Sequence, residues 1–360
     1  MLEIENFRSI DKILIKDTNY NVLTGNNEIL LRDICEAFDM YFNEKKISKW
    51  DKEVNDKTLI IQDYFSKEKE KTSYKCSVLI KNENIEEELL LGSKTLLYNT
   101  FNNFFKNTLL TEPIIMTINS LIKDLNLEEN IVSFNEELTK YADIKFKIEL
   151  EELGISDFIK KITITPEIGE KNISLLSLNS FEKLKLQLGI VEKNIATIGK
   201  DKIYIFIFPE KNLALKDLKK LKNFLYNLSK ENKIIVATFS NYLFDFSNTD
   251  NINIYFENYL SNSFLEEELL KELEMNYPIL ISVDEILKKL KFVLKQYLLS
   301  SLYSDVITNK FSENEDVLYI ENFEYMFLLL FYLKKSKIPY AKDLNYDYNS
   351  PFSNYIEEKL

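Results

Sequence analysis

The chain contains no histidine, and this absence restricts the chemistry that it can perform. Without an imidazole it has no Ser-His-Asp or Cys-His nucleophile system, no HExxH zinc motif and no histidine proton shuttle. An active site would have to use carboxylates, lysine, tyrosine or the two cysteines, Cys35 and Cys76. Two isolated cysteines are typical of a reduced cytosolic protein and not of a disulfide framework. The sequence therefore excludes the common histidine-dependent hydrolases.

The segment from Gly25 to Arg32 has the position of a phosphate-binding loop but not its residues. A P-loop, G-x-x-x-x-G-K-[ST], uses backbone N–H groups to cradle phosphate, a lysine to reach the β and γ phosphates and a hydroxyl to hold magnesium. Here the sequence reads Gly25-Asn26-Asn27-Glu28-Ile29-Leu30-Leu31-Arg32. Leu30, Leu31 and Arg32 occupy the places of the second glycine, the lysine and the hydroxyl residue, and Glu28 would repel phosphate. We therefore expect no nucleotide at Gly25, Leu31 and Arg32.

A second stretch has the setting of a Walker B strand without its acids. Residues 203–210 are an apolar run that ends in Pro-Glu, similar to the ABC pattern of apolar residues followed by Asp-Glu-Pro-Glu. Ile207 and Phe208 replace the aspartate that supports magnesium and the glutamate that polarises water. Residues 237–240, Ala-Thr-Phe-Ser, are similar to an Ala-Thr-His-Ser switch, with Phe239 in place of the histidine. Together these substitutions predict that the chain is not an enzyme.

The elements around these positions follow an α/β order. Residues 2–24 predict three short strands, and residues 29–42 have the apolar spacing of a helix. Residues 59–65 predict a further strand, and residues 74–80 and 85–91 predict a β-hairpin around Asn82-Glu83-Asn84. Three later runs, 202–208, 233–238 and 252–256, are as apolar as buried parallel strands, with an amphipathic helix at 215–228.

Helical patterns fill the rest of the chain. The expected helices lie within residues 94–141, 179–192, 265–273, 283–303 and 324–333, and residues 162–164 could form a strand. The predicted fold is α/β, a degenerate P-loop (ABC/SMC-like) sheet core with a helical insertion lobe and a C-terminal helical extension. The expected boundaries are 1–93 and 196–260 for the two parts of the core, 94–195 for the lobe and 261–360 for the extension. We hypothesise that residues 325–333 support a subunit interface.

Lysine clusters are the candidate contacts for nucleic acid. The net charge of −12 argues against a generally basic binding protein, although a binding channel can be locally positive. One cluster lies in an expected loop: Lys45, Lys46, Lys49 and Lys52. The other lies on the expected helix at 215–228: Lys216, Lys219, Lys220 and Lys222. The alternative for each cluster is an ordinary solvated face.

An oxygen-rich segment between two expected helices is the candidate metal site. Its donors are Asp124, Asn126, Glu128 and Glu129, and calcium prefers carboxylate and carbonyl oxygens. The alternative is helix capping by Asn126, with acids in the first turn of the next helix. Glu266, Glu267 and Glu268 are a weaker second candidate.

In the order of these elements, the chain resembles the Csn-two family of type II-A CRISPR adaptation proteins, in a long form with a C-terminal extension. The stretches that carry the resemblance are 21–42, 181–228 and 233–256, with the helical spacing between residues 94 and 141. The opening, Ile4-Glu5-Asn6-Phe7-Arg8, is also similar to the first strand of RecF/SMC-type ATPases.

The resemblance implies a non-catalytic role in spacer acquisition. It implies a homotetrameric ring that binds double-stranded DNA at linear ends, depends on calcium, takes no nucleotide, and acts in the cytoplasm with the CRISPR integrase proteins and the effector nuclease, away from any membrane. Two other functions remain open at this point: an SMC/RecF-type ATPase, and an ATPase-derived interaction protein without nucleic acid.

Overall fold

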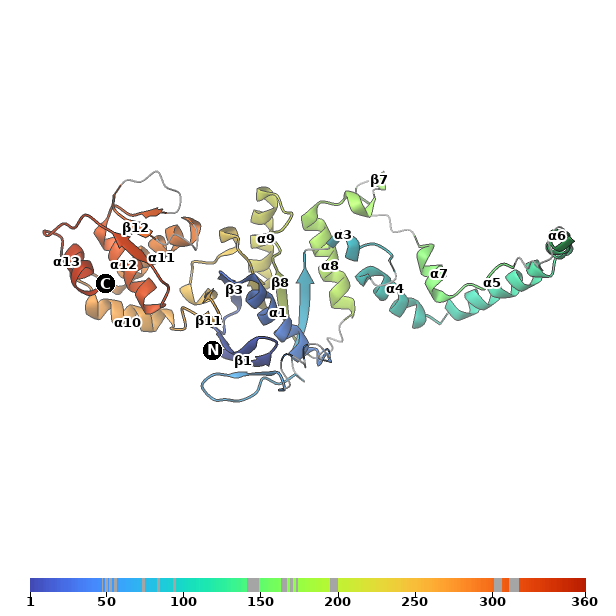
Figure 1. Cartoon of the computed structure of the whole chain (residues 1–360), viewed down its shortest axis with the longest axis horizontal. Helices are drawn as coiled ribbons and strands as arrows, with labels where there is room; N and C mark the ends of the chain where they lie inside the picture. The colour runs from blue at the N-terminus through green and yellow to red at the C-terminus, as the bar shows by residue number, and fades with distance from the viewer. Residues whose placement is uncertain are drawn as a thin grey trace. The chain divides into compact units, whose positions relative to one another are not determined.

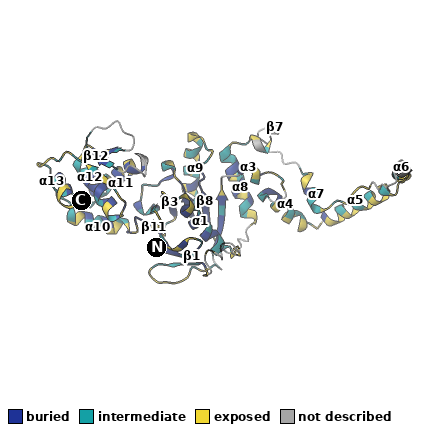
Figure 2. Cartoon of the chain, in the orientation of Figure 1, coloured by how far each residue is buried: buried dark blue, intermediate teal, exposed yellow. Residues whose placement is uncertain are grey.

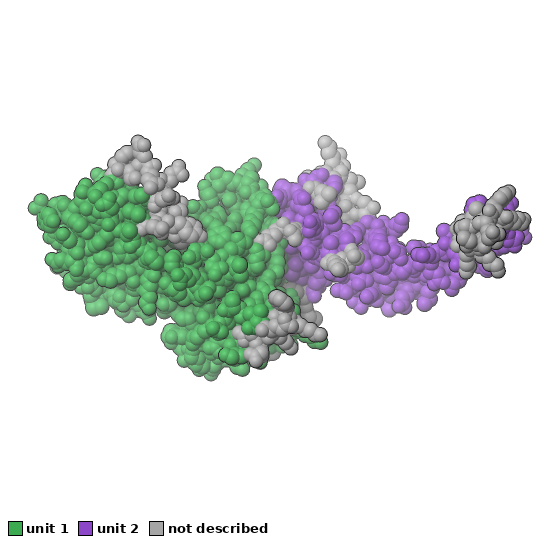
Figure 3. Space-filling view, in the orientation of Figure 1, with its two compact units in different colours: residues 1–83, 197–360 green, residues 84–196 purple. Residues whose placement is uncertain are grey.

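The structure is a computed structural model of the 360-residue chain, and it describes most of that chain. The residues outside the description are 47, 49–50, 52–53, 55–56, 73–74, 83–84, 93–94, 110, 141–148, 163–166, 169–170, 173, 195–199, 301–305 and 311–316. The chain divides into two compact units (Figure 3): Met1–Glu83 together with Thr197–Leu360, and Asn84–Ala196. Each unit is described separately below.

A six-stranded sheet forms the centre of the first unit (Figure 1). Its strands, in spatial order, are β11 (Tyr259–Leu260), β10 (Ile252–Phe256), β3 (Tyr20–Gly25), β9 (Lys233–Ala237), β8 (Asp201–Ile207) and β5 (Lys75–Lys81). The five strands from β10 to β5 are parallel, and β11 returns antiparallel to β10. The central strands are buried almost throughout, as the continuous apolar runs in the sequence predict. The predicted α/β fold is confirmed.

A smaller antiparallel sheet and helix α1 (Glu28–Phe42) complete the core. The small sheet has the order β2 (Ile10–Ile15), β1 (Leu2–Phe7) and β4 (Ile60–Asp63). One apolar cluster contains side chains from both sheets and from α1, among them Ile4, Ile34 and Ile235. Burial of these side chains stabilises the core by roughly 1.5–3 kcal/mol for each large residue.

The predicted β-hairpin around residues 82–84 is wrong. Strand β5 pairs in parallel with β8, so that Val78 lies opposite Tyr204, and residues Ile85–Glu88 form the short helix α3. The alternation of residues 75–80 identified a strand but could not identify its partner, which lies more than a hundred residues further along the chain. Asn82 ends β5 by donating from Nδ2 to the carbonyl of Pro209 at 3.0 Å.

The second unit is mainly helical. Its described elements are α3, α4 (Leu96–Lys106), α5 (Thr111–Asn126), α6 (Glu129–Lys140), β6 (Glu167–Ile168), β7 (Lys171–Asn172), α7 (Ile155–Lys160), a 3-10 turn (Leu175–Ser177) and α8 (Ser180–Asn194). Phe105 of α4 packs edge-to-face on Phe158 of α7, with 5.2 Å between ring centroids. The strand predicted at residues 162–164 lies largely outside the described residues.

Residues 261–360 belong to the first unit and form its C-terminal extension. The helices are α10 (Glu266–Asn276), α11 (Val283–Ser300), α12 (Phe323–Lys335) and α13 (Pro351–Lys359). The sequence did not predict a small parallel sheet of β13 (Val317–Tyr319), β12 (Val306–Thr308) and β14 (Ala341–Asp343), or helix α13. Most side chains of α12 are buried within this extension (Figure 2), so the hypothesis that this helix supports a subunit interface is not favoured.

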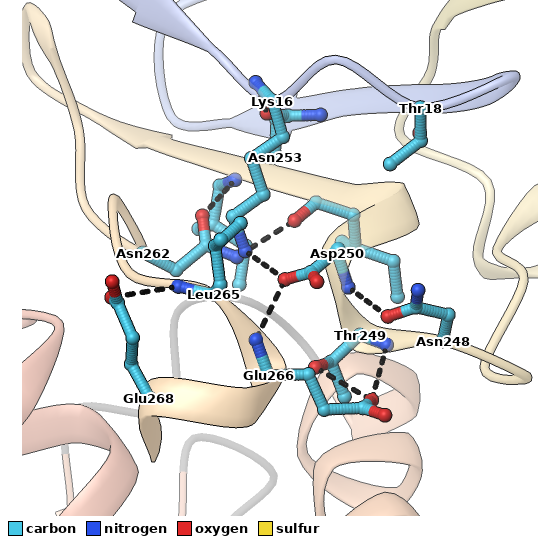
Figure 4. A network of polar contacts seen from close by, with 12 residues as sticks. Lys16, Thr18, Asn248, Thr249, Asp250, Asn253, Asn262, Leu265, Glu266 and Glu268 are labelled. Atoms are coloured by element: carbon cyan, nitrogen blue, oxygen red, sulfur yellow. Dashed lines mark hydrogen bonds and ion pairs between the residues drawn. The ribbon is translucent and has the colours of Figure 1, made fainter. Parts of the chain in front are cut away.

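A polar network joins the extension to the core (Figure 4). Lys16, which is 1% exposed, places its Nζ 3.3 Å from Oδ1 of Asp250, and the same oxygen accepts a hydrogen bond from the backbone N–H of Glu266 at 2.9 Å. Glu266 in turn accepts from the backbone N–H and the hydroxyl of Thr249. A buried lysine without a carboxylate would be costly, so this contact fixes the start of α10 against the core.

No helix in the described part of the chain combines the length and the apolar character that crossing a membrane requires.

Candidate functional site

Gly25 ends strand β3 in a conformation that only glycine adopts easily. Its φ is +155°, and a Cβ atom added there would lie 1.9 Å from the carbonyl oxygen of Tyr255 in β10. The next residue, Asn26, donates its backbone N–H to that same oxygen at 3.2 Å. The glycine therefore permits the close approach of β10 to the turn. Its backbone faces another strand, whereas the glycines of a P-loop face phosphate.

The turn after Gly25 is too short to be a phosphate cradle. Helix α1 begins at Glu28, so that only Asn26 and Asn27 separate it from β3, and Asn27 Oδ1 accepts the backbone N–H of Leu30 at 3.0 Å. A P-loop directs several free backbone N–H groups at the phosphates. Here the side chain of Asn27 accepts one of the few free backbone N–H groups at the start of the helix. Leu31 is fully buried in the core. The residue at the lysine position thus supports packing.

An aromatic pair occupies the carboxyl end of β8 and β9, where a nucleotide would lie in this layout. Phe208 stacks on Phe239 with 5.1 Å between ring centroids, and the N–H of Phe208 donates to the carbonyl of Ala237 at 2.8 Å. Ile207 and Phe208 are fully buried, while Phe239 is 40% exposed. The residues at the positions of the Walker B acids and the switch histidine are therefore apolar, and two of the three are fully buried.

Charged residues around this pair neutralise one another. Glu28 accepts from Arg32 at 3.1 Å and from Lys211 at 3.1 Å. The ammonium of Lys211 lies 4.6 Å from the ring centre of Phe208, and the guanidinium of Arg32 lies 5.8 Å from it. Both cations already have carboxylate and aromatic partners, so neither is an unengaged phosphate ligand.

Glu210, which the sequence pattern identifies only as a match to the ABC motif, is half-buried. Its Oε1 accepts the backbone N–H of Phe239 at 2.9 Å, whereas Oε2 is buried without a hydrogen-bond partner. Burial raises the pKa of this carboxyl group, although hydrogen bonds from residues 238–240 oppose the shift. The hydrogen bond from Phe239 holds the segment after β9 against the loop after β8.

The first lysine cluster is only partly described. Lys45 places Nζ 2.6 Å from Oδ2 of the buried Asp39, and Lys46 is exposed. Lys49 and Lys52 lie outside the described residues. The side chain of Lys45 is half exposed, but its ammonium group pairs with Asp39 of α1.

Helix α9 (Leu215–Leu228) presents the second cluster, and the structure separates its lysines into two groups. Leu221 and Leu225 bury one side, and the opposite, exposed side carries Lys216, Lys219, Lys220, Asn223 and Tyr226. Lys220 pairs with Asp217 at 3.0 Å, but no carboxylate of the described residues forms an ion pair with Lys216 or Lys219.

The fourth lysine of this cluster points elsewhere. Lys222 is half-buried, and its Nζ donates to the carbonyl of Phe244 at 2.7 Å. Three of the four predicted lysines therefore share the outer face of α9, which has the composition of a phosphate-contacting surface.

The predicted calcium ligands do not converge within one chain. Asp124, Glu128 and Glu129 are exposed, while the amide of Asn126 bonds both backbone groups of Leu150, accepting at 2.8 Å and donating at 2.9 Å. Within the residues that the structure describes, no group of three or more acidic or cysteine side chains is placed to hold a metal ion. A single copy of the chain thus does not build a complete calcium site at this junction.

The second acidic candidate is committed to other contacts. Glu266 bonds Thr249 and pairs with Lys291 at 3.3 Å, Glu267 pairs with Lys271 at 2.7 Å, and Glu268 caps the N–H of Leu265 at 3.2 Å. These three glutamates stabilise the start of α10.

The fold and this site define a class: an α/β chain with a six-stranded, mostly parallel sheet, in which the aromatic pair Phe208 and Phe239 lies at the carboxyl ends of β8 and β9. Among solved structures, the chain is similar to the crystal structure of Stu0660 of Streptococcus thermophilus, with a TM-score of 0.54 and 15% sequence identity. The likeness covers 99% of this chain and 100% of that one, so it includes the lobe and the extension. No family model and no curated protein matches the sequence.

Proposed function

We propose that this chain is a non-catalytic, double-stranded DNA-binding protein that assembles with itself and acts in CRISPR type II-A spacer acquisition in the cytoplasm. One observation carries the proposal: the outer face of α9 exposes Lys216 and Lys219 without carboxylate partners, on a chain with a net charge of −12. A protein of that charge repels DNA unless it presents a local cationic surface.

The composition of α9 suits a DNA backbone. Lysine, asparagine and tyrosine side chains all contact phosphates, and such contacts fix position without reading sequence. Lys216 and Lys219 lie one turn apart on one face, with Asn223 and Tyr226 continuing it. Binding through this face is therefore independent of sequence and strongly dependent on salt.

Self-assembly is supported by the helical unit. The side chains Ile114, Ile118, Leu121 and Leu125 recur on α5 at intervals of four, three and four residues, the spacing of a helix-packing seam. Ile114, Leu121 and Leu125 are 47%, 58% and 48% exposed. A helix seam this open is unusual on a monomer, and it supports packing against a second copy in the proposed homotetramer.

Calcium belongs to the proposal as a link between copies. Because one chain supplies only the exposed Asp124, Glu128 and Glu129 at the end of the α5 seam, the remaining oxygens would come from another copy or from water. No nucleotide is required, since the residues at that position serve packing.

The CRISPR setting is supported by the resemblance of the sequence to the Csn-two family and by a fold likeness that runs the full length of a known structure. In this setting the integrase proteins and the effector nuclease are the proposed partners, and linear DNA ends are the proposed substrate.

A DNA-binding titration tests the function. Fluorescence anisotropy with a linear duplex should show binding that weakens steeply with salt, and that weakens in the variant Lys216→Gln/Lys219→Gln. Closed circular DNA of the same length should compete poorly. The matched control is Lys271→Gln on α10, an exposed lysine that pairs with Glu267. Absence of a complex with linear DNA at low salt in calcium would refute the proposal and favour an interaction protein without nucleic acid.

A further inference from the structure

The segment between β9 and β10 is flanked by lysines from two different parts of the first unit. On one side, Lys222 of α9 donates to the carbonyl of Phe244 at 2.7 Å. On the other side, Lys291 of α11 donates to the carbonyl of Ser247 and pairs with Glu266 at 3.3 Å. Both helices therefore border the same short segment, α9 from the core and α11 from the extension.

Each of these anchored lysines has a second lysine beside it on its own helix. Lys219 lies three residues before Lys222, and Lys295 lies four residues after Lys291, so each second lysine is about one helical turn from the anchored one. Lys219 and Lys295 are exposed, and no carboxylate of the described residues forms an ion pair with either. Lys288, one turn before Lys291, is also exposed.

Acidic groups also lie near these lysines, and some of them are engaged in other contacts. Asp245, in the segment itself, accepts hydrogen bonds from the N–H of Ser247 at 3.0 Å and from Asn251 Nδ2 at 2.7 Å. Asp284 lies one turn before Lys288, at the start of α11. Burial lowers the pKa of Lys222; the charge of Asp245 opposes this shift, and the charge of Lys295 adds to it.

We infer that α9 and α11 together form a second contact for the DNA backbone, in which Lys219 and Lys295 bind phosphates on either side of the segment 244–247. The inference rests on the proposed DNA binding and gives the C-terminal extension a part in it. Exposed aromatic rings stand beside both lysine pairs, Tyr226 at 51% and Phe292 at 49% exposure, and can pack on the sugar edges of the backbone.

The polar network at the start of α10 explains why the extension can hold this position. Glu266 accepts hydrogen bonds from Thr249 (Figure 4) and also pairs with Lys291, so a single carboxylate connects the segment after residue 248 with α10 and α11. The buried Lys16–Asp250 pair fixes the same end of the segment. Lysines on α11 are thus held relative to α9 by contacts that do not depend on DNA.

The test compares three full-length variants by anisotropy with one linear duplex over a salt series. Lys219→Gln/Lys295→Gln should weaken binding and reduce the slope of log K against log[salt] by about 2, since one counterion is released for each phosphate contact. Lys295→Gln alone should reduce the slope by about 1. Lys337→Gln, an exposed lysine elsewhere in the extension, is the control and should leave affinity and slope unchanged.

The outcomes separate the two proposals. If the wild-type protein binds no DNA, the proposed function fails and this inference fails with it. If Lys216→Gln/Lys219→Gln weakens binding but Lys295→Gln does not, DNA binding stands and the role of α11 is refuted. A calorimetric titration with inorganic phosphate alone distinguishes the source of the anion: tight binding that Lys295→Gln removes would show a small-anion site and overturn the backbone contact.

Discussion

Apolar side chains are buried at the carboxyl edge of the six-stranded sheet, but they are exposed along the seam of α5. At the sheet edge, Leu31 and Phe208 are buried in positions that a phosphate-binding enzyme would give to polar residues. On α5, Leu121 and Leu125 are exposed at positions that a monomeric helix would bury or make polar. The difference is that the first region buries its apolar side chains within the single chain, whereas the second leaves them exposed, as the proposed self-association would need.

The largest loss of stability at the sheet edge is expected when a methyl group is added at Gly25. Gly25→Ala would place Cβ on the carbonyl of Tyr255 at a φ of +155°, so β3 and β10 must separate. We expect a loss of about 3 kcal/mol or more in the free energy of unfolding, measured by urea denaturation. Gly189→Ala, in helix α8 with no atom near the added Cβ, is the control and should stabilise by up to about 1 kcal/mol. Equal stability of the two variants would contradict the close approach.

The second change tests whether α5 lacks a partner in the monomer. Leu121→Asp/Leu125→Asp replaces two exposed leucines, so folding should survive while self-association is lost, because a charge in an apolar seam is costly to desolvate. Light scattering after size exclusion measures the mass. Ser120→Asp, exposed on another side of the same helix, should leave the mass unchanged. A double variant with the oligomeric mass of the wild type would show that the seam is not an interface.

A smaller effect is expected from Glu210. Its pKa is raised by burial, so the folded state keeps a proton that the unfolded chain loses near 4.5, and stability should fall as pH rises from about that value through the raised pKa. Glu210→Gln keeps the acceptor for the N–H of Phe239 and removes the titration. Its stability should therefore depend less on pH over this range in thermal unfolding scans. A pH profile identical to that of the wild type would show that folding does not raise the pKa of Glu210.

The last prediction is that the protein does not bind ATP. Titration of ATP and magnesium into the protein should give no saturable heat, because the turn at Asn26-Asn27 and the pair Phe208/Phe239 leave no phosphate cradle. The control is the same titration with Arg32→Gln. Saturable micromolar binding that this variant abolishes would restore the alternative of an SMC/RecF-type ATPase.

Much of the core could be predicted from the sequence because its strands are buried on both faces. Runs such as 202–208 and 233–238 read as strands without knowledge of their neighbours, and helix α9 was predicted with its observed bounds. The pairing of β5 with β8 could not be predicted, since alternation is a local signal and strand pairing is not. The short strands β12 to β14 were missed because three residues are too few to show a period.

The candidate site was predicted unevenly. The sequence located Gly25, Phe208 and Phe239 by motif order, and the structure brings Phe208 and Phe239 into contact. It could not show that Gly25 faces Tyr255, which depends on the packing of a strand 230 residues away. Nor could the spacing of the lysines on α9 separate Lys222 from its neighbours, because the carbonyl that it bonds comes from outside the helix.

The contact between Gly25 and Tyr255 also bears on how the chain can fold. It joins two adjacent strands of one sheet whose segments are encoded on either side of Asn84–Ala196. During synthesis β3 therefore emerges long before β9 and β10, its two neighbours, and it stays an unpaired apolar edge until the intervening helices have left the ribosome. The entropic cost of closing so long a loop rises only slowly with its length. Folding that depends on such distant contacts is nevertheless slow. Strand β3 is thus the part of the central sheet that waits longest for its neighbours while the rest of the chain is made.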